Sequence, residues 1–61
     1  MYYIGMDIQK RISTAVVIDD DEKTIAQYVD FETKDEMLDT VVKSYPPSDT
    51  VILIENLMAP I

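Results

Sequence analysis

Two carboxylates in this sequence stand where they could do chemistry. Asp7 lies near the end of the apolar stretch Tyr2–Ile8, and Glu55 directly follows the apolar residues 51–54. If these stretches are neighbouring strands, about 4.8 Å apart, the carboxylates repel each other unless solvent separates them or a divalent cation bridges them. Asp7 and Glu55 are therefore the candidate catalytic residues and metal ligands, with weakly bound Mg²⁺ as the cofactor. Two carboxylates are too few for both ions of two-metal phosphoryl chemistry.

A plainer interpretation of these residues stays open. An acid at the end of a strand also solvates a chain end or accepts hydrogen bonds from turn N–H groups. Gly5 either allows close backbone approach at a site or marks a bulge or a packing constraint. The acidic run 19–22 lacks the twelve-residue spacing and central glycine of a calcium loop, so we interpret it as a solvated turn.

Composition excludes several classes of function. The chain has no Cys and no His, which excludes disulfides, thiolate or imidazole metal sites, cysteine nucleophiles and histidine bases. Twelve acidic residues against five basic ones give a net charge of -7, the wrong sign for binding a phosphate backbone. The apolar fraction of 48% is nevertheless that of a folded domain.

The positions of these acids depend on the elements that carry them. Residues 2–8 and 12–19 are rich in β-branched and aromatic side chains, which predicts two strands, and the alternating pattern of residues 24–31 predicts a third that pairs in a hairpin. The continuous apolar run 51–54 is typical of a central parallel strand buried on both faces.

A helix is predicted between the third and fourth strands. Thr33 and Glu36 have the spacing of a capping box, and Pro46 ends the helix at Ser44 or Tyr45. The apolar residues of this helix fall on one stripe that faces the sheet: Met37, Leu38, Val41, Val42 and Tyr45. Residues 46–50 then form a loop, and residues 56–61 form a short tail.

Residues 1–61 are thus expected to form a single α/β domain with the element order β-β-β-α-β. A meander of three strands followed by a right-handed crossover gives the spatial strand order 3-2-1-4, with the fourth strand parallel to the first. This order places Asp7 and Glu55 at the same edge of the sheet.

Three segments resemble the start of DEDD-type insertion-sequence transposases, whose N-terminal domain is similar to RuvC resolvases and has a ribonuclease H-like fold. They are residues 3–10 (Tyr-Ile-Gly-Met-Asp-Ile-Gln-Lys), residues 13–19 (Ser-Thr-Ala-Val-Val-Ile-Asp) and the apolar strand ending in Glu55. The resemblance implies that Asp7 and Glu55 are two of four acidic ligands for metal-dependent DNA strand cleavage and transposition. The sequence departs from the family at Gln9, usually histidine, and at residues 56–58, commonly alanine-threonine-glycine.

We therefore expect a truncated ribonuclease H-like domain, a fragment or remnant of such a transposase that is catalytically inactive alone. The later acids and the C-terminal domain of the family would be missing. DNA as a partner follows only from the resemblance. The alternative is a homodimeric, non-enzymatic association module, because a small domain with an open strand edge and an uncovered sheet face gains burial by pairing.

A third hypothesis is a metal-dependent nuclease assembled across a dimer, with two acids from each chain. A cytoplasmic location and no membrane partner are expected, since the N-terminus has no basic region and no apolar run approaches about 18 residues.

Overall fold

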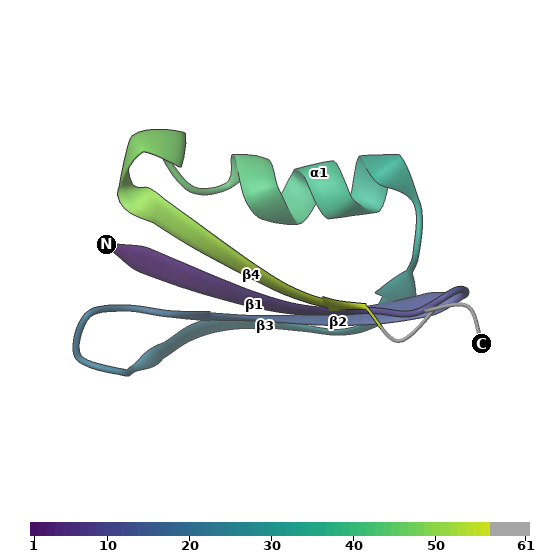
Figure 1. The fold of residues 1–61 in the computed structure, drawn as a ribbon, viewed down its shortest axis with the longest axis horizontal. Coiled ribbons are helices and arrows are strands. Elements are labelled where there is room, and N and C mark those ends of the chain that lie inside the picture. The colour runs from purple at the N-terminus through teal and green to yellow at the C-terminus, as the bar shows by residue number, and fades with distance from the viewer. Residues whose placement is uncertain (57–61) are drawn as a thin grey trace.

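A computed structural model describes residues 1–56 and shows a four-stranded sheet with one helix on one of its faces (Figure 1). The elements are β1 (Tyr2–Ile8), β2 (Ile12–Ile18), β3 (Thr24–Glu32), α1 (Asp35–Lys43), the short 3-10 helix η1 (Pro47–Asp49) and β4 (Thr50–Asn56). The strand order β3-β2-β1-β4 confirms the predicted topology. Asn56 belongs to β4 rather than to the predicted tail, and residues 57–61 lie outside the described residues.

β1 is the strand around which the sheet is organised. It pairs antiparallel with β2 on one side and parallel with β4 on the other, and β2 pairs antiparallel with β3. The parallel pair requires a crossover connection, which α1 provides above one face of the sheet in Figure 1. The carboxyl ends of β1 and β4 therefore lie at the same end of the molecule.

The hydrophobic core lies between α1 and the sheet. Ile4 and Met6 of β1, Ala15 and Val17 of β2, and Val41 of α1 are buried there. These strand residues alternate along the chain, so they occupy the helix-side face, while the residues between them occupy what we call the open face. Of the predicted helix stripe, Met37 is exposed instead.

Tyrosine side chains pack against the sheet just after the carboxyl-terminal end of α1. The rings of Tyr2 and Tyr45 are 5.2 Å apart and tilted by 51°. Hydrogen bonding to Tyr28, together with burial, raises the pKa of Tyr45 to about 12. These tyrosines therefore fix the end of the helix segment against the sheet.

The predicted capping box at the start of the helix is wrong. Lys34 occupies the N-cap position and no side chain caps the helix. The Thr33 hydroxyl instead donates to the Gln9 carbonyl oxygen at 2.7 Å, and the buried Ser13 hydroxyl lies 2.6 Å from the same Thr33 oxygen. Because the single Thr33 proton goes to Gln9, Ser13 donates to Thr33. Thr33 thus ties the β1–β2 turn to the end of β3 and is not available to the helix.

The prediction that residues 51–54 form a central strand buried on both faces is also wrong. β4 is an edge strand of the described sheet, with Val51 and Ile52 38% exposed, Ile54 60% and Leu53 64%. The physical reason is the position of α1, because the core that it covers is formed by residues of β1, β2 and β3 and by none of the described residues of β4. Within the described residues, no helix is long and apolar enough to cross a membrane.

Candidate metal site at the ends of β1 and β4

Asp7 and Glu55 are directly opposite each other in the parallel pairing of β1 and β4. Opposed residues on neighbouring strands share a face, and this pair lies on the open face because it alternates with the buried Met6. The predicted strand order therefore brings the two candidate residues together as expected.

Thr14 is a third member of this group that the sequence analysis did not identify. It lies opposite Asp7 on the other side of β1, in the antiparallel pairing with β2. Counting outward from the turn at residues 9–11 would have found it, since Ile8 pairs with Ser13 and Asp7 with the next residue. Its hydroxyl adds an oxygen of the kind that Mg²⁺ accepts as a ligand.

These residues surround a shallow hollow of about 310 Å³ on the open face. Its lining is Gly5, Met6, Asp7, Thr14, Val16, Leu53, Ile54 and Glu55. A Cβ atom added at Gly5 would meet no other atom within 4 Å, and β1 passes through this position with no register shift to either neighbour. Gly5 therefore marks neither a bulge nor a packing constraint, and it leaves the backbone at the hollow open to approach.

One oxygen of the Asp7 carboxylate, Oδ1, has no hydrogen-bond partner among the described residues. This atom is also buried. A buried carboxylate oxygen without a partner is costly, so such atoms are normally paired with donors or cations. An acid that only accepted turn N–H groups would have those partners, which favours a ligand role for Asp7.

Basic side chains lie at the same end of the sheet as Asp7 and Glu55. Lys10, Arg11 and Lys34 line a second hollow of about 530 Å³ at the same end of the sheet, together with Glu32. Lys34 forms an ion pair with Glu32 at 3.0 Å, whereas Lys10 and Arg11 form none with residues 1–56. Among the described residues, no three acidic side chains gather closely enough to hold a metal.

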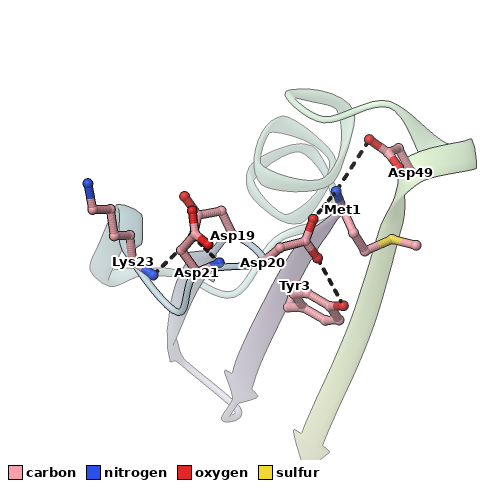
Figure 2. Close-up of polar contacts among 7 residues, drawn as sticks. All are labelled: Met1, Tyr3, Asp19, Asp20, Asp21, Lys23 and Asp49. Atoms are coloured by element: carbon pink, nitrogen blue, oxygen red, sulfur yellow. Dashed lines mark hydrogen bonds and ion pairs between the residues drawn. The ribbon is translucent and has the colours of Figure 1, made fainter.

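The acidic run 19–22 forms a turn at the opposite end of the sheet, as predicted. The Asp19 Oδ1 atom accepts hydrogen bonds from the backbone N–H groups of Asp21 and Lys23, at 2.9 and 3.0 Å (Figure 2). This arrangement uses the carboxylate to form the turn. The turn therefore does not present a second metal site.

Neighbouring acids at this end hold the N-terminus. The Met1 ammonium lies 3.0 Å from Asp20 and 3.6 Å from Asp49, and the Tyr3 hydroxyl donates to Asp20 at 3.3 Å (Figure 2). The hydrogen bond that the Met1 ammonium donates to Asp20 raises the pKa of this ammonium. Here carboxylates are neutralised by a positive group, in contrast to Asp7 and Glu55.

Comparisons of the chain with protein-family models, with curated proteins and with solved structures found no match. The resemblance to DEDD-type transposases remains a prediction from the residues quoted above.

Proposed function

We propose that this chain is part of a RuvC-like domain of the DEDD transposase type, in which Asp7 and Glu55 form half of a divalent-metal site. The observation that carries the proposal is their opposition across β1 and β4 beside an open hollow, with Asp7 Oδ1 lacking a partner. Carboxylate and hydroxyl oxygens are hard ligands that suit Mg²⁺ and Mn²⁺. A site of this kind binds a cation weakly, in the millimolar range.

In this proposal the isolated chain does not cleave DNA. Two-metal phosphoryl transfer needs two ions about 4 Å apart, and two carboxylates cannot hold both. The net charge of -7 also opposes capture of a nucleic acid. The chain is thus a fragment or remnant of the catalytic domain, and a cytoplasmic location remains part of the proposal.

Titration with Mn²⁺ followed by NMR tests this function. The paramagnetic ion should broaden the amide signals of residues 5–7 and 53–55 first, and Asp7→Asn should abolish that broadening. Asp21→Asn is the matched control, because it removes one charge at the other end of the sheet. Broadening that begins at residues 19–22, or that survives Asp7→Asn, would contradict the proposed site.

A second candidate function is homodimeric association, and the exposure of apolar side chains favours it. Leu53 and Ile54 of the edge strand β4 are 64% and 60% exposed. An apolar edge strand favours pairing with another strand, and a 61-residue domain gains stability from the added burial. The thermal midpoint should therefore rise with protein concentration. A midpoint that stays constant over a hundredfold dilution range would contradict association.

A further inference from the structure

The outer edge of β4 has none of the usual protections against pairing with another strand. Its inner edge pairs with β1 without any register shift. Residues 51–54 contain no charge, no proline and no glycine. Because no other described strand lies beyond β4, the N–H and C=O groups of alternate residues point outward along a straight apolar edge.

We propose that β4 pairs antiparallel with β4 of a second copy of this chain, about a twofold axis through Leu53. This inference rests on the association proposed above and names its surface. Two copies then share one continuous sheet with their helices on the same side.

The register follows from the faces of the strand. Directly opposed residues of an antiparallel pair lie on the same face of the sheet. A twofold axis normal to the sheet therefore passes beside one residue of β4, and that residue is opposed to the same residue of the second copy. An axis at Leu53 pairs Leu53 with Leu53 of the second copy on the open face and Ile52 with Ile54 on the helix side. An axis at Ile52 would oppose Asp49 and Glu55, which is unfavourable because like charges repel across strands.

The distribution of charge favours the antiparallel arrangement of two copies. Three of the five basic residues lie at the end where β4 finishes: Lys10, Arg11 and Lys34. The acidic turn 19–22 and Asp49 lie at the end where β4 begins. Antiparallel pairing sets the acidic end of each copy beside the more basic end of the other, whereas parallel pairing would set acidic ends together.

This interface closes on itself. A twofold interface uses the same surface on both copies, so each β4 edge is consumed in the dimer. The edges that remain are the two β3 strands, which have register shifts against β2 next to Ser13 and Val17. Bulged edges resist further pairing, so the assembly stops at two copies.

Pairing through β4 keeps the two acidic sites separate. Glu55 stands two residues beyond the axis in each copy, so the two Glu55 positions are four residues apart, about 13 Å along the strand. Two ions that act together lie only about 4 Å apart. This arrangement thus argues against a nuclease composed across the dimer and makes metal binding independent of association.

Single cysteine variants test the pairing, since the chain has no Cys of its own. Leu53→Cys places two thiols opposite each other across the proposed axis. Val29→Cys is the matched control, because Val29 is equally exposed and lies on the other edge strand. With oxidised glutathione at micromolar protein, Leu53→Cys should form a disulfide-linked dimer at least about tenfold faster than Val29→Cys, owing to proximity.

The outcomes separate this inference from the association on which it rests. If the unmodified chain is a dimer and Leu53→Cys cross-links no faster than Val29→Cys, the copies associate by another surface and β4 pairing is wrong. If the unmodified chain sediments as a monomer at all concentrations, the association itself is wrong. Far-UV circular dichroism of both variants confirms that they fold, as expected for side chains that are 64% exposed.

Discussion

The two edge strands of this sheet differ in how they are protected, although both are long and partly apolar. β3 has two register shifts against β2, and Asp30 within it adopts a left-handed φ of 53°. The carboxyl-terminal half of β3 also carries the acidic residues Asp30 and Glu32. β4 is regular and presents only aliphatic side chains between Thr50 and Glu55.

The position of the helix increases this difference. The β3 residues Ala26, Tyr28 and Phe31 pack partly against the core that α1 covers. On β4, Ile52 and Ile54 share the helix-side face but stay 38% and 60% exposed. One edge of the sheet therefore resists pairing, and the other gains apolar burial from it.

The largest expected effect comes from placing a charge on each edge strand, which tests whether β3 and β4 differ in their tendency to pair. Leu53→Lys should raise the dissociation constant of the dimer at least about 30-fold, or about 2 kcal/mol, because it removes apolar burial and opposes two like charges. Val29→Lys should change it less than about threefold, as surface substitutions usually do. Sedimentation velocity over a dilution series measures both. Equal effects of the two variants would show that the edges are equivalent.

The next effect concerns the anchor at the end of β3. Thr33→Val leaves the buried Ser13 hydroxyl and the Gln9 carbonyl without their partner, so it should lower the free energy of unfolding by about 1–2 kcal/mol. Glu36→Ala should change it by less than about 0.5 kcal/mol, because no capping box forms. Urea unfolding of the two variants checks the contrast. A larger loss for Glu36→Ala than for Thr33→Val would indicate that the capping box forms.

A smaller effect is expected at Gly5, which lies on the open face next to β4. Its φ is not positive and a Cβ there has room, so Gly5→Ala should stabilise the chain by about 0.5–1 kcal/mol through reduced backbone entropy of the unfolded state. Thermal unfolding at one fixed protein concentration measures this change. Destabilisation would mean that the backbone at the hollow is constrained in a way that the contacts do not show.

The smallest effect is a pH dependence at the end where both edge strands begin. The Met1 ammonium contacts Asp20, which precedes β3, and Asp49, which precedes β4 (Figure 2). Because the folded structure raises the pKa of this ammonium above its ordinary value of 8.0, the stabilisation is fully present below pH 8 and is lost as the pH rises through the folded value. Urea midpoints between pH 7 and about 10 should fall less for Asp20→Asn than for the unmodified chain. If the urea midpoints of the two proteins fall equally with pH, Asp20 is not the cause of the pH dependence.

Much of the fold could be predicted because local patterns and topology agree. The apolar runs give the four strands, and the crossover rule gives the order that sets Asp7 beside Glu55. The errors arise where tertiary context decides. Thr33 has the sequence of a cap but bonds to Ser13 and Gln9, residues more than nineteen positions away in the chain.

Local sequence patterns could not predict the exposure of β4 or the structure of the candidate site either. A continuous apolar run indicates burial on two faces, but it carries no information about which elements supply that burial. The hollow depends on the joint register of β1 with β2 and with β4, which adds Thr14 and Gly5 to the two acids. The sequence singled out Gly5 without deciding its role, whereas Thr14 is identified only by the register of β1 with β2.

The most direct test of the central claim, that the β4 edge associates with a second copy, is the molar mass of the unmodified chain in solution. Light scattering over a dilution series, with and without Mg²⁺, should give twice the 7.0 kDa chain mass at high concentration and the same curve in both conditions. A mass of 7.0 kDa at every concentration would contradict the account, and so would a dimer that forms only with Mg²⁺.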